Sequence, residues 1–229
     1  MSQSPPPIAV FDLDGTLADT IHDLISTLNV VMDREGLPHL PLREGREMVG
    51  AGARALIERG LTSAGREVTP AHLDELFRLF MVHYGDNLCV ETTLFPGVVD
   101  ALDRLENAGF LLAVCTNKYE KLSVQLLESL GLAGRFAAIC GRDSFPYFKP
   151  DPRHLTLTIA KAGGDPGRAI MVGDSVTDIA TAKAAGIPSV AVTFGYTDIP
   201  VQQLGPDRII DHYDELFGTV QTLLRTVAA

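Results

Sequence analysis

Short apolar runs recur along the chain, and each of them ends at polar or acidic residues. The runs at 8–11, 111–115 and 169–172 are wholly apolar and short, so they predict strands buried on both faces of a parallel sheet. From Phe95 onward, such runs alternate with segments that carry apolar residues at helical spacing. This alternation predicts an α/β fold, with a Rossmann-like parallel sheet and helices on both of its faces.

A different pattern separates the first predicted strand from the others. Between Ala18 and Thr92 the apolar residues follow helical spacing, and no strand-like run interrupts them. Helices are expected to start at Asp19 or Thr20, to run over about 43–59, and to start at Pro70. We therefore predict a helical domain over residues 18–92, inserted into a discontinuous α/β core of residues 1–17 and 93–229. The core is expected to hold helices at 97–108, 119–130, 152–162, 177–185 and 213–227, and strands at 111–115, 136–140, 169–172 and 189–192.

Polar side chains that could take part in catalysis follow the predicted strands. Parallel sheets bind ligands just beyond the carboxyl ends of their strands, and residues i and i+2 of an extended segment face the same side. Asp12 and Asp14 can therefore share one pocket, although an acidic turn after a strand is also common. The strand ends and one proline-flanked loop contribute Asp12, Asp14, Thr116, Asp174, Asp178 and Lys149. Their equivalent positions in one fold predict an active site.

Four segments resemble the motifs of the haloacid dehalogenase-like hydrolases, and within them the magnesium-dependent phosphatases. DLDGT at 12–16 resembles the first motif, Thr116 the second, Lys149 in FKPDP the third, and GDSVTD at 173–178 the fourth. They occur in the expected order and cover essentially the whole chain. The segment VGAGARAL at 49–56 is similar to the phosphoglycolate phosphatase branch. The resemblance implies that the helical insertion is a cap over the active site.

The resemblance and the chemistry of carboxylates assign roles to the acidic residues. Asp12 is the candidate nucleophile, because a carboxylate can attack phosphorus and form an acyl phosphate that water later opens. Mg²⁺ would offset the charge of the two approaching anions. Asp12 and Asp174 can supply oxygen ligands, and the resemblance implies the backbone carbonyl of Asp14 as the third. The Asp14 side chain is then free to transfer protons to the leaving oxygen and from water.

The remaining candidates would bind substrate or support the site. Lys149 is expected to pair with Asp12 or a phosphate oxygen, and Thr116 to donate to a phosphate oxygen. Asp178 either orients Lys149 or a metal-bound water, or only complements the helix dipole. Weaker substrate-binding candidates are Asn117, Gly15 and Thr16, the last two through their amides. Arg54 is a candidate contact for a substrate carboxylate, a role for which Arg43 and Arg46 compete.

Composition narrows the environment and the partners. The formal net charge of −10 argues against nucleic acid or an anionic membrane as a partner. The N-terminal residues lack the pattern of a signal peptide, and the three cysteines lack a disulfide or zinc spacing. We therefore expect a cytoplasmic protein with reduced thiols, either a monomer or a homodimer. Its expected partner is a small phosphorylated metabolite, and its expected cofactor is Mg²⁺.

These features predict a phosphomonoester hydrolase with an aspartyl-phosphate intermediate, and the resemblance implies 2-phosphoglycolate as its substrate. Alternatives are a phosphatase of sugar phosphates, nucleotides or pyrophosphate, or a phosphosugar mutase that returns the phosphoryl group. A non-catalytic regulator that binds metal or phosphate is the alternative outside enzymes. A dehalogenase is disfavoured, since that branch needs no metal and this chain retains Asp14 and Asp174. A phosphonate hydrolase is disfavoured because residues 18–92 contain no lysine.

Overall fold

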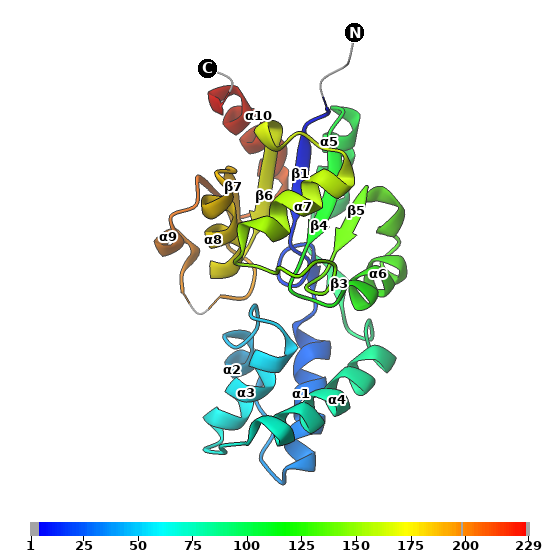
Figure 1. The fold of residues 1–229 in the computed structure, drawn as a ribbon, viewed down its shortest axis with the longest axis vertical. Helices are drawn as coiled ribbons and strands as arrows, with labels where there is room; N and C mark the ends of the chain where they lie inside the picture. Colours follow the sequence, from blue (N-terminus) through cyan, green and yellow to red (C-terminus); the bar gives the residue numbers. More distant parts are fainter. Residues whose placement is uncertain (1–4, 198, 228–229) are drawn as a thin grey trace.

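A parallel sheet lies at the centre of the computed structural model, which describes residues 5–197 and 199–227, with side chains described to residue 225 (Figure 1). In this part of the chain the sheet has six strands in the spatial order β5-β4-β1-β6-β7-β8. The strands are β1 (Ile8–Phe11), β4 (Leu111–Cys115), β5 (Ala138–Cys140), β6 (Ala169–Gly173), β7 (Ser189–Val192) and β8 (Arg208–Ile210). β1 pairs in parallel with both β4 and β6, so Ile8 lies opposite Leu111 on one side and Ala169 on the other. The first strand of the chain therefore occupies the centre of the sheet.

Alternate residues of the central strand enter different cores. Ile8 and Val10 pack with Leu155 and Ile159 of one covering helix. Ala9 and Phe11 belong to the cluster on the other face, which contains apolar residues of two further helices. One face is covered by α7 (Pro152–Ala162) and α8 (Val176–Ala185), the other by α5 (Val98–Asn107) and α10 (Leu216–Val227). The predicted α/β fold with helices on both faces is confirmed.

Four helices lie together beyond the carboxyl ends of the strands, away from both termini (Figure 1). They are α1 (Ile21–Arg34), α2 (Leu42–Arg46), α3 (Ala53–Ser63) and α4 (Pro70–Asp86). An antiparallel ribbon of β2 (Ala18–Asp19) and β3 (Thr93–Leu94) connects them to the sheet. The ribbon lies at the two predicted boundaries of the inserted segment, between residues 17 and 18 and between residues 92 and 93. The division into a core of residues 1–17 and 93–229 and a cap of residues 18–92 stays a prediction, which this arrangement favours.

The helix predicted over about 43–59 is wrong, because the segment forms two helices. Residues 47–52 form no helix between α2 and α3. Gly50 and Gly52 have φ angles of 109° and 91°, which lie outside the helical region. Gly52 is also the residue that precedes the first turn of α3. The two glycines therefore allow the chain to leave one helix and start another.

Most other boundaries fall within two residues of those expected. Asp151 caps α7 through the amide of Arg153, with Pro152 in the first turn. The helix expected at 119–130 is α6 (Glu120–Ser129). The elements that the pattern did not predict are short: β2, β3, β8, α9 (Val201–Leu204) and the 3₁₀ turns η1 (Ala133–Arg135), η2 (Pro166–Arg168) and η3 (Tyr213–Glu215). Within the described residues, no helix is both long and apolar enough to cross a membrane. The three cysteines are unpaired, and Cys115 and Cys140 are buried.

Candidate active site

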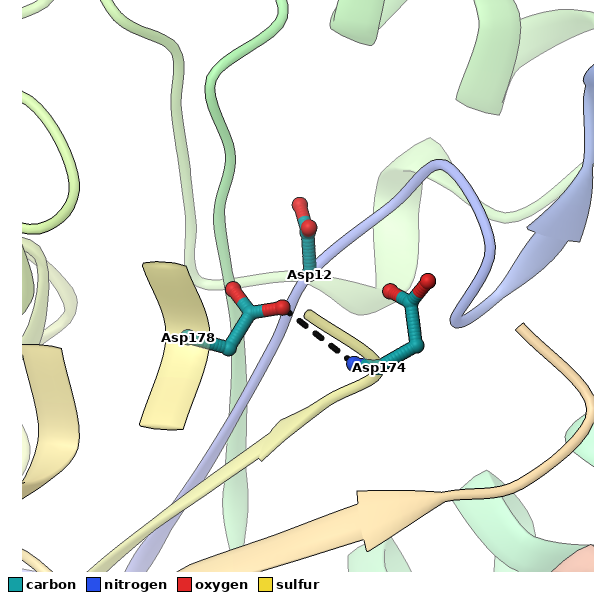
Figure 2. A group of neighbouring side chains, drawn as sticks. All are labelled: Asp12, Asp174 and Asp178. Carbon is teal, nitrogen blue, oxygen red and sulfur yellow. Dashed lines mark hydrogen bonds between the residues drawn. The ribbon is translucent and has the colours of Figure 1, made fainter. Parts of the chain in front are cut away.

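Three aspartates from two neighbouring strands meet at the carboxyl end of the sheet (Figure 2). Asp12 follows β1, Asp174 follows β6, and Asp178 lies in the first turn of α8. One carboxylate oxygen from each residue lies within 4.8 Å of the others, and all three residues are buried. Parallel pairing of β1 with β6 brings these residues together, as the sequence predicts.

Lys149 supplies the positive charge nearest to these carboxylates. Its Nζ lies 3.0 Å from Oδ1 of Asp12 and 2.6 Å from Oδ1 of Asp178, and its side chain is fully buried. Burial disfavours its charged form, but Asp12 and Asp178 outweigh this and raise the pKa of Lys149 above its ordinary value. The ammonium group therefore stays charged between the two carboxylates. The expected pairing of Lys149 with Asp12 is present.

One ammonium group, that of Lys149, faces three carboxylates, and the pKa values of two of them are raised. Burial raises the pKa of Asp12 to about 6, helped by Asp178 and opposed by Lys149 and the Thr116 hydroxyl. Burial, with Asp178 and Asp12 nearby, raises the pKa of Asp174 well above its ordinary range. Carboxylate oxygens at this spacing and with this charge excess are the donor set that suits Mg²⁺. The residues present therefore fit the metal that the sequence predicts.

The hydrogen bonds separate the roles of Asp174 and Asp178. Oδ2 of Asp178 accepts from the amides of Asp174 and Ser175 and from the Ser175 hydroxyl, while its Oδ1 contacts Lys149. Both of its oxygens are thus engaged in capping α8 and holding Lys149. This geometry is compatible with both interpretations of Asp178, orienting Lys149 and complementing the dipole of α8. Asp174 accepts from the Thr16 hydroxyl at 2.8 Å and from the amide of Tyr196 at 2.6 Å.

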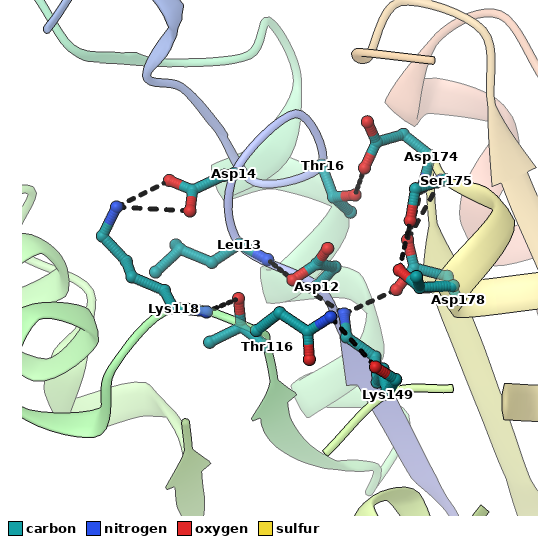
Figure 3. A network of polar contacts seen from close by, with 12 residues as sticks. Asp12, Leu13, Asp14, Thr16, Thr116, Lys118, Lys149, Asp174, Ser175 and Asp178 are labelled. Atoms are coloured by element: carbon teal, nitrogen blue, oxygen red, sulfur yellow. Dashed lines mark hydrogen bonds and ion pairs between the residues drawn. The ribbon is translucent and has the colours of Figure 1, made fainter. Parts of the chain in front are cut away.

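The Asp14 carboxylate turns away from this group toward a second lysine (Figure 3). Lys118 Nζ lies 2.9 Å from Oδ1 and 3.2 Å from Oδ2 of Asp14. It also donates to the hydroxyl of Tyr84, on α4, at 2.6 Å. The Asp14 side chain is thereby separate from the carboxylates that fit a metal, as a proton-transfer role requires. Its backbone carbonyl as a metal ligand stays a prediction.

Thr116 and Asn117 lie where β4 ends, beside Asp12. The Thr116 hydroxyl accepts from the amide of Lys118 at 3.2 Å, and it helps to lower the pKa of Asp12. Asn117 Nδ2 donates to the carbonyl of Lys149 at 3.1 Å, which ties the loop before α7 to the end of β4. Its buried Oδ1 has no partner in the described part of the chain. Both residues line a cavity between the helices α1–α4 and the carboxyl end of the sheet.

Gly15 and Thr16 shape the turn after β1. Gly15 has a φ of 80°, and a Cβ at this position would overlap the Asp174 carboxylate. A glycine is therefore required for Asp174 to approach. The amides expected to face substrate are engaged within the turn: Gly15 donates to the carbonyl of Ala18, and Thr16 to that of Leu13. The Thr16 side chain instead contacts Asp174.

A cavity of about 50 Å³ lies between the cap helices and the sheet edge. The core contributes polar residues to it, and the cap contributes mainly apolar ones. Its lining comprises Asp12, Asp14, Thr116, Asn117, Lys118, Tyr119 and Leu122 from the core, and Leu24, Val49, Gly50, Gly52, Ala53, Leu56, Phe80, Met81 and Tyr84 from the cap. Arg54 is not among these residues. Its guanidinium pairs with Asp74 in an exposed position, so the structure does not bring Arg54 to the site.

The sequence reasoning assigned no role to Lys118 or Tyr84. Lys118 follows Thr116 by two residues at a strand end, which is the spacing that brings side chains to one side. Tyr84 lies at an apolar position of its helix, but a tyrosine hydroxyl needs a polar partner when it is buried. Lys118 contacts Tyr84, which lies 34 positions away in the sequence, and Asp14, which lies 104 positions away. No local pattern indicates such contacts.

The comparisons with known proteins agree with this geometry. The sequence profile of the haloacid dehalogenase-like hydrolases matches residues 9–192, which include every candidate catalytic residue. The chain therefore belongs to the haloacid dehalogenase-like hydrolase family. The resemblance on which the sequence prediction rests is confirmed.

Two relatives and one solved structure are similar over almost the whole chain. A phosphoglycolate phosphatase from Mesorhizobium japonicum is 52% identical, over 97% of each chain. A phosphoglycolate phosphatase from Agrobacterium fabrum is 48% identical, over 92% of this chain and 90% of the relative. The crystal structure of a predicted phosphoglycolate phosphatase from Haemophilus somnus has a TM-score of 0.87 and 33% identity, and the match covers 93% of this chain and 97% of that one.

Proposed function

We propose that this protein is a magnesium-dependent phosphatase that converts 2-phosphoglycolate to glycolate and phosphate through an aspartyl-phosphate. Membership of the hydrolase family and the names of the two similar relatives support the reaction and its substrate. The observation that carries the proposal is Asp12, at the end of the central strand, in contact with Lys149 and grouped with Asp174 and Asp178. A nucleophile, a cation and a donor set for Mg²⁺ thus lie in one place.

Phosphoryl transfer begins at Asp12. A carboxylate oxygen of Asp12 attacks phosphorus, a bond from this oxygen to phosphorus forms, and the bond from phosphorus to the glycolate oxygen breaks. Asp14, in its protonated form, donates its proton to the departing oxygen. Lys149 and the Thr116 hydroxyl stabilise the charge on the phosphoryl oxygens. Glycolate leaves, and Asp12 carries the phosphoryl group.

Water completes the reaction. Asp14, now a carboxylate, accepts a proton from water as the water oxygen attacks phosphorus. The bond between phosphorus and Asp12 breaks, so phosphate is released and both aspartates return to their starting states. Mg²⁺ bound by Asp12, Asp174 and the Asp14 carbonyl would offset the negative charge of enzyme and substrate. Thr16 and Tyr196 hold Asp174 in place for this role through their hydrogen bonds.

The size of the cavity beneath the cap helices favours a small substrate. The cavity of about 50 Å³ is far smaller than sites for larger ligands, which reach several hundred Å³. Helices that close over the sheet edge exclude water while Asp12 is being phosphorylated. A small phosphorylated metabolite is thus the partner we propose.

The unpaired Cys115 and Cys140 support a cytoplasmic location.

Phosphate release from a panel of esters tests the proposal. The panel contains 2-phosphoglycolate, sugar phosphates, nucleotides and pyrophosphate, each with and without Mg²⁺ at neutral pH. Magnesium-dependent release that is fastest with 2-phosphoglycolate is expected. Faster release from another ester would retain the chemistry and reject the substrate. Release from none of them would reject the phosphatase and favour a mutase or a binding protein.

A matched pair of variants tests the nucleophile. Asp12→Asn removes the attacking carboxylate with little change in shape and is expected to abolish turnover, whereas Asp100→Asn makes the same change at an exposed position. Circular dichroism should show both variants folded. Mass spectrometry of acid-quenched protein should find the added phosphoryl group on the unmodified chain and not on Asp12→Asn. Full activity of Asp12→Asn would reject the mechanism.

A further inference from the structure

The cavity beneath the cap holds a single basic side chain. Among its lining residues in the described chain, Lys118 is the only lysine or arginine. Its side chain is 4% exposed. Lys149 lies deeper and is engaged with Asp12 and Asp178, which leaves it to the phosphoryl end of a substrate. Any negative charge at the other end of a bound substrate would therefore meet Lys118.

Arg46, Arg54 and Arg142 do not line the cavity, and each of them has contacts of its own. Arg54 pairs with Asp74, and Arg46 donates to the carbonyl of Phe194 at 2.8 Å. Arg142 stacks on the rings of Phe148 and Tyr119, with its guanidinium carbon 4.6 and 5.7 Å from their centres. The side chains that the cap directs into the cavity are mainly apolar. They offer a substrate carboxylate no charge partner.

The surroundings of Lys118 leave it able to take a second anion. Two of its contacts are with both oxygens of one carboxylate, that of Asp14, and the third is with the Tyr84 hydroxyl. An ammonium group has three hydrogens, so it can keep one oxygen of Asp14 and turn another hydrogen to a ligand. Lys118 Nζ also lies 4.5 Å from the centre of the Tyr84 ring, which stabilises a cation. A neutral ligand would gain none of the charge interaction.

We propose that Lys118 binds the carboxylate of the substrate and thereby selects small phosphate esters that carry a second negative charge. This inference rests on the proposed phosphatase function. A carboxylate that enters a buried apolar cavity loses its water and needs a charged partner in return. Lys118 is placed to be that partner, beside Asp14, which acts on the oxygen that joins the phosphoryl group to the rest of the substrate. Tyr84 brings the cap to the same ammonium group, so a bound carboxylate also favours the closed cap.

Two esters of equal size isolate the charge. 2-Phosphoglycolate and 2-phosphoglycolamide differ in carrying a carboxylate or a neutral amide at the same position. The measured quantity is the ratio of kcat/KM for the two esters, because effects on the phosphoryl chemistry cancel in it. The wild-type protein is expected to favour the carboxylate by about 100-fold. Lys118→Met should bring the ratio close to one, and Lys118→Arg should retain part of the preference.

A control variant and an inhibition assay complete the test. Lys121→Met removes an exposed lysine from the neighbouring helix α6 and should leave the ratio unchanged. Glycolate should inhibit hydrolysis of the neutral ester, and Lys118→Met should raise its inhibition constant by about 100-fold. Tyr84→Phe keeps the ring but loses the hydroxyl, and is expected to lower the ratio less than Lys118→Met does.

The outcomes separate this inference from the function on which it rests. If Lys118→Met lowers kcat/KM for both esters by one factor, Lys118 acts only by positioning Asp14, and the inference fails. If the variant does not fold, the wild-type ratio decides, since a value near one rejects a charge-selective site. A wild-type protein that hydrolyses neither ester nor any other phosphate rejects the proposed function itself.

Discussion

Lys149 and Asp178 form an ion pair of 2.6 Å in which both side chains are fully buried. Asp178 does not face the cavity, yet it holds the ammonium group that contacts Asp12 at 3.0 Å. It also accepts from the amides of Asp174 and Ser175. The Asp178 carboxylate thus positions Lys149, which contacts the candidate nucleophile Asp12. It also positions the loop that carries the candidate metal ligand Asp174. The arrangement makes Asp178 a positioning residue.

Asp178→Asn is expected to impair both folding and catalysis. The variant leaves Lys149 with one charge partner and faces an amide N–H₂ toward either Lys149 or the loop amides. Loss of one partner of a buried pair typically lowers the free energy of unfolding by about 3 kcal/mol. Urea unfolding measures this change, and Asp100→Asn serves as the exposed control. A positioning role also predicts a lower kcat with little change in KM, and equal unfolding curves for both variants would contradict it.

Another buried aspartate, Asp23 on α1, anchors the helices of residues 18–92. Its carboxylate accepts from the amides of Val90, Glu91 and Thr92, each at 3.0 Å, and from the Thr92 hydroxyl at 2.7 Å. These donors belong to the segment that returns the chain to the core. Asp23 therefore fixes the cap helices to one of the two connections at which the cap would hinge.

Asp23→Asn is expected to lower the free energy of unfolding by about 2 kcal/mol, because an amide donor would face groups that also donate. Asp33→Asn makes the same change at an exposed position of the same helix and should alter stability little. Hydrogen exchange followed by mass spectrometry should show faster exchange at residues 90–92 in Asp23→Asn alone. Unchanged exchange there would show that the carboxylate does not hold this segment.

Arg46 makes a direct contact between cap and core. It lies on α2, donates to the carbonyl of Phe194 at 2.8 Å, and places its guanidinium carbon 5.2 Å from the centre of the Tyr196 ring. Tyr196 in turn donates its amide to Asp174 and its hydroxyl to Asp19, at the start of the cap. The contact thus connects α2, through Tyr196, to a candidate metal ligand.

Arg46→Met is expected to reduce kcat/KM by about 10-fold, since a closed state destabilised by roughly 1.4 kcal/mol is ten times less populated. The free energy of unfolding should change little, because the guanidinium is exposed. Steady-state kinetics and urea unfolding on one preparation separate the two effects. Arg34→Met, an exposed change at the end of α1, is the control. Equal kinetics for both variants would reject Arg46 as a closing contact.

The sequence predicted the parts of the site that depend on strand ends. Asp12, Thr116 and Asp174 follow apolar runs, and a parallel sheet brings such ends to one edge whatever the details of packing. The helix expected at 43–59 forms two helices, because the positive φ angles of Gly50 and Gly52 interrupt it and helical spacing alone does not give the φ angle of a residue. Arg54 was one of three candidates for a substrate carboxylate, and its pairing with Asp74 was not foreseen because it is a tertiary contact between α3 and α4. Lys118 was missed for the same reason, since its partners Asp14 and Tyr84 lie after β1 and on α4, far from it in the sequence.

Below neutral pH, His154 on α7 should make an unfavourable contribution to stability. It is buried, and its Nε2 lies 3.1 Å from the carbonyl of Gly141, so the neutral ring carries its proton there. Its Nδ1 has no partner within the described residues. Burial, with Lys149 nearby, lowers the pKa of His154 from 6.5 to about 4. A second proton would place an unpaired charged N–H group in the core.

The direction of the pH effect follows from this lowered pKa. Between pH 6.5 and 4 the unfolded chain binds the proton and the folded protein does not, so the free energy of unfolding falls as pH falls through this range. The loss from His154 alone is about 3 kcal/mol, and it is absent above pH 6.5. Urea unfolding of the wild-type protein and of His154→Gln, which keeps a donor for Gly141, measures it. The two proteins should differ more at pH 7 than at pH 4.5, whereas His39→Gln, at an exposed site, should follow the wild-type profile. A constant difference between wild type and His154→Gln would mean that the ring does not titrate as its burial requires.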